Sequence, residues 1–247
     1  MTASDTSSPS GNHVGSWYLK GLRAAVGLPA LILAATFVGI GSVCEAYGMP
    51  LLWAVLATIL VWAGPAHLIL VGGLGTGASW IVVAIAVGLS SVRLLPMVVS
   101  IVPYLRAGRP SFFTLLLASH FVAISSWVEG LRLLPGVAPE GRLSFYGGMA
   151  TGYLTVATLF TVAGYAISGV ISPIFGAGLL FLTPIFFLLS LLGASRTLGD
   201  HLPVVAGIAG VVITAPLGDG LELLWAGVGG GTLAYLGARA LRRRGRV

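Results

Sequence analysis

Long apolar runs follow one another along almost the whole chain, separated by short polar or glycine- and proline-rich stretches. None of them alternates strictly between apolar and polar residues, as a membrane-spanning β-strand would, so the pattern predicts helices. A helix needs about 20 mostly apolar residues to cross the roughly 30 Å of hydrocarbon in a bilayer, so we predict an all-α integral membrane protein with about seven or eight transmembrane helices. The runs cover residues 25–46, 50–73, 78–104, 112–134, 144–170, 174–193, 202–215 and 221–240.

Two of these runs carry a helix-breaking residue in their interior. Pro65 follows Gly64 in the second run, and Pro184 lies inside the sixth. Corresponding broken helices in two halves of a chain point to a transporter with internal repeats and a midplane site. The stretches 27–41 and 151–164, which precede the two interrupted runs, are both apolar and glycine-containing. An internal repeat is therefore a hypothesis that the sequence raises and leaves open.

Polar residues at both ends limit the membrane-embedded part to residues 20–240. Residues 1–19 are mostly polar and rich in Ser and Thr, and they lack the basic start and apolar core of a cleaved signal peptide. We expect a disordered tail there. Residues 241–247 form a basic tail directly after an apolar run. Such a cluster predicts a cytoplasmic flank that is attracted to anionic lipid.

The composition agrees with a bilayer environment. Apolar residues make up 57% of the chain and charged residues 8%, with a mean hydropathy of +1.01, whereas a soluble domain carries about 25% charged residues. The net charge of +6 gathers near the C-terminus, so it gives no reason to expect a nucleic-acid partner. The single cysteine, Cys44, excludes an internal disulfide.

The distribution of basic residues favours a cytoplasmic location for both ends if the chain crosses eight times. In that arrangement Arg106 and Arg109 fall on the outer side, against the positive-inside rule. The conflict disappears if an interrupted segment, such as the second run, is a re-entrant hairpin. The number of crossings therefore depends on which arrangement is adopted.

Ionisable groups in the middle of a bilayer are costly and normally face a bundle interior or a hydrated cavity. Arg93 lies inside the third run beside Ser91, and a guanidinium can hold a substrate carboxylate with two hydrogen bonds. His67 follows the break at Gly64 and Pro65, where freed backbone groups at a helix N-terminus favour an anion. We predict that these five residues bind substrate. The alternative is a purely structural role, in which Arg93 is tied to a helix end and His67 is a packing residue.

The fourth run carries a second set of polar residues. His120, Ser119 and Ser126 can lie within one polar stripe that lines a pathway or carries a proton. The competing interpretation is hydrogen bonding between helices, a common role of serine in membrane bundles. Glu129 precedes Arg132 by three residues, which predicts a simple ion pair.

Several chemistries have no support in the sequence. It contains no G-x-x-x-x-G-K-[ST] phosphate loop, no G-x-S-x-G nucleophile motif and no H-E-x-x-H metal motif. His67 and His120 lack an evident third ligand for a metal. We therefore predict neither an enzyme nor a cofactor.

Four segments in order resemble the AzlC family of branched-chain amino acid exporters: "GLPALILAATFVGIG" (27–41), "WAGPAHLIL" (62–70), "SSVRLLP" (90–96) and "LASHFVA" (117–123). Ala63, Gly64 and Arg93 match the family's pattern directly. His67 stands where the family has Gln, Ser91 where it has Asn and Leu94 where it has His. Ser119 and His120 occupy the positions of the family's acidic pair, so the usual candidates for a proton carrier are absent.

The resemblance, which extends over about residues 20–240, implies a multi-pass protein of the bacterial inner membrane. It implies export of branched-chain or other neutral amino acids, driven by an ion gradient, together with a small hydrophobic membrane subunit of the AzlD type. Two alternatives remain. One is an uncoupled channel or a permease for a different small solute, and the other is a membrane assembly subunit that does not itself transport.

Overall fold

The computed structural model describes residues 10–61, 63–170, 172–194, 198–214, 216 and 229–243, and the regular structure in them is entirely helical. Within the described residues, three helical stretches are long and apolar enough to cross a membrane: Leu28–Ala46, Trp80–Gly108 and Pro139–Ala166. The prediction of an all-α, multi-pass membrane protein is thus confirmed. The chain divides into two compact units, residues 1–183 and 184–247.

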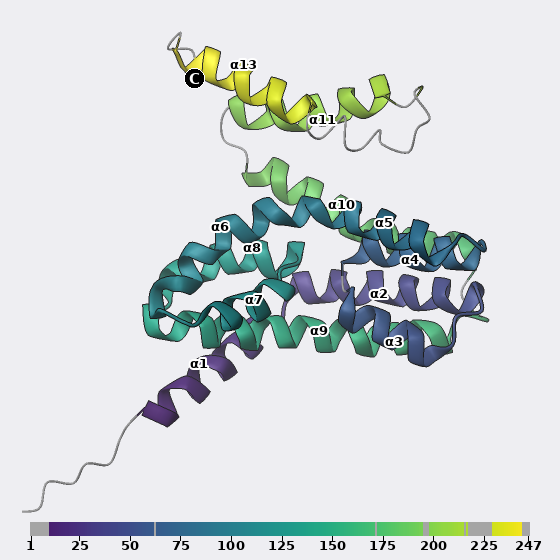
Figure 1. The fold of residues 1–247 in the computed structure, drawn as a ribbon, viewed down its shortest axis with the longest axis horizontal. Helices are drawn as coiled ribbons and strands as arrows, with labels where there is room; N and C mark the ends of the chain where they lie inside the picture. Colours follow the sequence, from purple (N-terminus) through teal and green to yellow (C-terminus); the bar gives the residue numbers. More distant parts are fainter. Residues whose placement is uncertain are drawn as a thin grey trace, which may run out of the picture. The chain divides into compact units, whose positions relative to one another are not determined.

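Close packing against one long helix organises the first unit. Helices α1 (Ser10–Ala24) and α2 (Leu28–Ala46) follow each other along α9 (Arg142–Ala166) (Figure 1). Glycines allow this approach, because a Cβ atom at Gly148 would overlap the carbonyl of Tyr18 and one at Gly164 would overlap the carbonyl of Val38. Small residues that bring backbones together are the usual basis of helix association in membranes. Helix α1 includes residues 10–19 of the stretch expected to be a disordered tail; residues 1–9 lie outside the described residues.

The second apolar run does not cross the bundle but folds back on itself. It forms α3 (Leu51–Leu60) and α4 (Gly64–Gly75), of 10 and 12 residues. At about 1.5 Å per residue each is too short for roughly 30 Å of hydrocarbon. Gly75 at the end of α4 packs against Tyr47, which lies just before the start of α3. The two helices therefore enter and leave at the same end, as Figure 1 shows, and we call them the first hairpin.

The fourth run forms a second hairpin that enters from the opposite end. Its arms are α7 (Phe112–His120) and α8 (Ile124–Leu133), of 9 and 10 residues. Gly108 precedes α7, and a Cβ atom added to it would lie 3.5 Å from the carbonyl oxygen of Pro139, which follows α8. The chain therefore enters and leaves the second hairpin at the same end. Between the hairpins, α5 (Trp80–Ser91), η1 (Val92–Leu94), α6 (Leu95–Leu105) and η2 (Arg106–Gly108) cross as one apolar stretch.

A helix followed by a hairpin thus occurs twice, in opposite directions: α2 with α3–α4, and α5–α6 with α7–α8 (Figure 1). The second break does not fall at Pro184 as expected, because α10 (Pro173–Ala194) is helical through that residue. It falls instead at residues 121–123, between α7 and α8. The repeat is therefore not the one suggested by residues 27–41 and 151–164.

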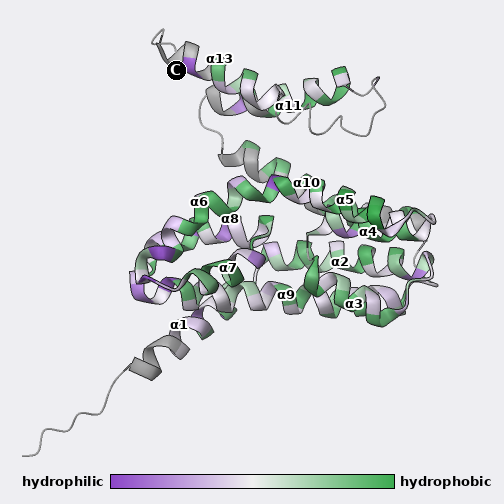
Figure 2. Cartoon of the chain, in the orientation of Figure 1, coloured by the Kyte–Doolittle hydropathy of each residue, from purple (hydrophilic) through white to green (hydrophobic). Residues whose placement is uncertain are grey.

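The hairpins also remove the conflict over Arg106 and Arg109. The turn η2 packs against η4 (Pro139–Gly141), beside Arg142, whose guanidinium lies 5.9 Å from the ring centroid of Tyr104. Figure 2 shows hydrophilic residues gathered there. We call this the basic end; the positive-inside rule leads us to expect it on the cytoplasmic side. The basic residues on the elements that reach it are Lys20, Arg23, Arg106, Arg109, Arg132 and Arg142.

The second unit contains α11 (Leu198–Thr214) and α13 (Gly231–Arg243), which pack together. Gly230 adjoins the carbonyl of Ala206 at this contact, where a side chain would not fit. Of the predicted basic tail, residues 241–243 belong to α13, and residues 244–247 lie outside the described residues.

Candidate functional site

The two hairpins meet near the middle of the first unit. The ring Nε2 of His120, at the end of α7, lies 3.2 Å from the carbonyl oxygen of Ile59, near the end of α3. The C-termini of α3 and α7 and the N-termini of α4 and α8 therefore converge there (Figure 1). Such ends carry free carbonyl and N–H groups and opposite partial charges, so they can bind a zwitterion. We call Val61 and Ala63 the first tip, and residues 121–123 the second tip.

At the first tip, the break begins α4 with Gly64 and Pro65, and it positions His67 in the first turn. His67 is fully buried, with 0% of its surface exposed. Its Nε2 lies 3.8 Å from Sγ of Cys44 on α2, and its ring meets Phe37 edge-on. Its Nδ1 is buried and has no hydrogen-bond partner among the described residues. An unsatisfied buried nitrogen is costly unless something else, such as a ligand, binds it.

At the second tip, side chains satisfy the interrupted backbone. The Ser126 hydroxyl donates to the carbonyl of Phe121 at 2.6 Å and accepts from the N–H of Ala123 at 3.0 Å. The Tyr146 hydroxyl, on α9, donates to the same Phe121 carbonyl at 3.1 Å. His120 and Ser126 thus flank one tip, whereas the Ser119 hydroxyl donates to the Leu115 carbonyl within its own helix.

Arg93 and Ser91 lie in different surroundings from the tips. Arg93 is exposed in the 3-10 turn η1, between α5, which packs on α4, and α6, which packs on α7 and α8. The Ser91 hydroxyl donates to the Val87 carbonyl at 2.8 Å. Among the described residues, no hydrogen bond or ion pair joins Arg93 to His67 or His120. The structure therefore brings the two tips together, and it shows no hydrogen bond or ion pair from Arg93 to either histidine in the described residues.

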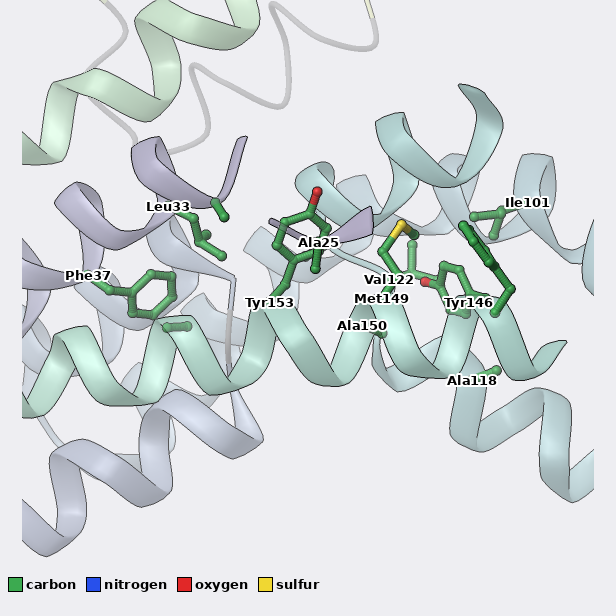
Figure 3. Packing of buried hydrophobic residues seen from close by; sticks show 14 of the residues in the cluster. Ala25, Leu33, Phe37, Ile101, Ala118, Val122, Tyr146, Met149, Ala150 and Tyr153 are labelled. Atoms are coloured by element: carbon green, nitrogen blue, oxygen red, sulfur yellow. The ribbon is translucent and has the colours of Figure 1, made fainter. Parts of the chain in front are cut away.

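Sequence reasoning missed Tyr153, which lies on α9 between the contacts to the two hairpins. Tyr146, two turns before it, contacts the second tip, and Thr161, about two turns after it, shares a hydrogen bond of 3.1 Å with Thr58 on α3. The Tyr153 hydroxyl is buried without a partner among the described residues. Figure 3 shows it pointing away from α9 beside Ala25, at the break between α1 and α2. The only available signal was the seven-residue spacing of Tyr146 and Tyr153, which puts both on one face of a helix.

The predicted ion pair between Glu129 and Arg132 is confirmed, with Arg132 Nε donating to Glu129 Oε2 at 2.9 Å. Its burial was not foreseen, because Glu129 is only 8% exposed. The carboxylate thus belongs to the interior of the bundle.

An apolar groove of about 550 Å³ lies along the first hairpin. It extends from the first tip to the turn between α2 and α3. A groove of this kind can accept an aliphatic side chain or a lipid chain. Its lining includes Tyr47, Trp53, Leu60, Val61, Val71 and Leu74.

Comparison with protein-family models gives one match, a model described as "AzlC protein", over residues 29–171. The matched segment contains nearly all of α2, both hairpins and all of α9, which are the elements that build the site. Searches of curated proteins and of solved structures found no match.

Proposed function

The chain belongs to the AzlC family, a non-enzymatic family of branched-chain amino acid transporter subunits, and on that premise we propose that it exports branched-chain or other neutral amino acids. We propose the bacterial inner membrane as its location and an ion gradient as its driving force. Because members of the family typically pair with AzlD, we also propose a small AzlD-like membrane subunit as its partner.

The observation that carries the proposal is the meeting of the two hairpin tips. A neutral amino acid bears a carboxylate and an ammonium group, and the converging helix ends offer a counterpart to each. The N-termini of α4 and α8 suit the carboxylate, and the carbonyl ends of α3 and α7 suit the ammonium group. The apolar groove along the first hairpin suits an aliphatic side chain.

In this proposal, Gly64, Pro65 and His67, in the first turn of α4 directly after the first tip, bind the substrate. The unpartnered Nδ1 of His67 supports its role, because a bound carboxylate would satisfy it. Arg93 and Ser91, in and beside the turn of the crossing stretch, would attract the carboxylate as it enters. His120 and Ser126 at the second tip, with Ser119 one turn away, would line the pathway.

Two oppositely directed hairpins also support alternating access. Each hairpin opens toward one end of the bundle, so movement of one would expose the tips to one side only. The two helix-and-hairpin units have opposite directions, so the same movement in either unit would open the site to opposite sides.

The test is export of amino acids from cells that express the full-length chain with an AzlD-type subunit. Cells preloaded with leucine, valine or isoleucine through a dipeptide should release them faster than cells with empty membranes. His67→Phe keeps the aromatic volume beside Phe37 and Cys44 but removes both nitrogens. Losing a hydrogen bond to a charged group costs about 1.5–3 kcal/mol, so export should fall roughly 10- to 100-fold.

Thr155→Ala is the matched control. Thr155 is exposed on α9 and its hydroxyl bonds only to the Thr151 carbonyl, so the variant should export normally. Normal export by a folded His67→Phe variant would remove His67 from the site. Absence of export of any neutral amino acid by the wild type would reject the function.

A further inference from the structure

Glu129 is a buried carboxylate in the interior of the helix bundle. Of the acids whose burial the structure describes, Glu45, Glu129 and Glu140, it alone is buried. A carboxylate is expensive to remove from water unless it is paired and hydrogen-bonded, and buried ionisable groups in membrane proteins usually mark ion pathways. Its burial therefore needs an explanation beyond the ion pair with Arg132.

The two partners of the Glu129–Arg132 ion pair differ in exposure. Arg132 Nε and Nη2 both donate to Glu129 Oε2. The Arg132 side chain is 66% exposed, whereas the Glu129 side chain is 11% exposed. The Arg132 side chain thus extends out of the bundle at the basic end, while the carboxylate is buried. If the carboxylate became neutral, the exposed arginine could turn to water, so no unpaired charge would be left buried.

Between Glu129 and the second tip, further polar groups lie on α8 and on the neighbouring α9. Helix α8 packs against α9, on which the buried hydroxyl of Tyr153 has no partner among the described residues. One turn before Glu129, Ser126 contacts the Tyr146 hydroxyl at 3.4 Å and the carbonyl of Phe121 at 2.6 Å. Polar groups therefore follow α8 from the basic end to the middle of the bundle.

We propose that Glu129 is the proton-carrying group that couples transport to a proton gradient, and that the polar groups between Arg132 and the second tip form its path. This inference rests on the proposed function of the same site. A proton from water binds the carboxylate and forms a neutral acid, and Arg132 keeps its own proton and turns to solvent. Return of the proton to water restores the ion pair.

Other titratable groups lie on α2, α6 and α9, the helices that pack against α8. Arg142 lies over the ring of Tyr104, and Cys44 contacts His67. The groups concerned are Tyr104 on α6, Arg142, Tyr146, Tyr153 and Tyr165 on α9, and Cys44 and Glu45 on α2.

The test uses the full-length chain, purified with an AzlD-type subunit and placed in liposomes of defined lipid. Two activities are measured: exchange of labelled leucine for unlabelled leucine without a pH gradient, and leucine accumulation driven by an imposed pH gradient. Glu129→Gln should retain exchange but lose gradient-driven accumulation. Glu129→Asp keeps a carboxylate and should retain both. Glu140→Gln, which removes an exposed acid at the same end, should also retain both.

A second variant covers the case in which Glu129→Gln does not fold. Glu129→Gln combined with Arg132→Gln removes both charges together and should show the same loss of coupling. Gradient-driven accumulation by either folded variant would overturn the proposal, and so would loss of exchange in both, which would assign Glu129 to substrate binding. Failure of both to fold would assign it a structural role. Absence of leucine exchange by the wild type would instead reject the proposed function.

Discussion

Aliphatic and aromatic side chains line the groove along the first hairpin, whereas the second hairpin buries polar groups on the arm that faces α9. The buried polar residues of α8 are Ser125, Ser126 and Glu129, and Arg132 follows at the basic end. In the first hairpin, the buried polar residues are Thr58 and His67. The two hairpins thus have the same shape and opposite directions but different linings.

This difference indicates a division of tasks under the proposed function. An apolar groove that leads from the tips to the end opposite the basic residues suits an aliphatic cargo. A column of hydroxyl, carboxylate and guanidinium groups that leads to the basic end suits protons. Coupling would then arise at the contact between His120 and Ile59, where the two hairpins touch.

The largest effect is expected from overpacking one hairpin and not the other. A Cβ at Gly130 in α8 would lie 2.6 Å from Ile101 Cδ1 and 3.5 Å from Tyr146 Cε2, while one at Gly72 in α4 would meet no atom within 4 Å. Gly130→Leu should therefore lower the stability by about 3 kcal/mol, because the larger side chain must displace Ile101 and crowd the neighbouring Tyr146. Gly72→Leu should leave the stability almost unchanged. Thermal unfolding in detergent measures both, and equal losses would contradict the difference in packing.

A smaller effect is expected from removing one buried hydroxyl in each hairpin. Ser126→Ala leaves the N–H of Ala123 without its partner and should cost about 2 kcal/mol. Thr58→Val removes a hydroxyl that bonds the Ala54 carbonyl and Thr161 within regular helices, and it should cost about 1 kcal/mol or less. The same unfolding measurement ranks them. A greater loss for Thr58→Val would mean that the second tip does not depend on its side chains.

The break at the first tip could be predicted from the sequence and the break at the second could not. Gly64 and Pro65 interrupt a helix by their own backbone properties. No glycine or proline lies within residues 117–127. That break is stabilised by hydrogen bonds from Ser126 and Tyr146, and contacts made only in the folded bundle leave no local signal. Pro184 shows the reverse, because α10 accommodates the proline without a break.

The folding-back of the second run was one of the arrangements that the sequence left open, but that of the fourth run was not foreseen, since hydropathy counts apolar residues and does not register a reversal of direction. The one signal was the conflict of Arg106 and Arg109 with the positive-inside rule, which the re-entrant arrangement removes. Likewise, the spacing of Glu129 and Arg132 predicted their ion pair but not that one partner is buried and the other exposed.

The smallest effect concerns the contact between the tips. The His120 ring donates to the Ile59 carbonyl, so His120→Leu should cost about 1 kcal/mol, the net value of one hydrogen bond. The loss should be felt mainly at the first tip, because the second tip keeps its own bonds from Ser126 and Tyr146. Hydrogen exchange should therefore quicken at the amides of Val61 and Ala63 and stay unchanged at Ala123. Ser119→Ala, one residue earlier, removes a hydroxyl that bonds within α7 and should change neither tip. Equal acceleration at both tips would show that the hairpins open as one unit, and separate gating of the two sides would then lose its basis.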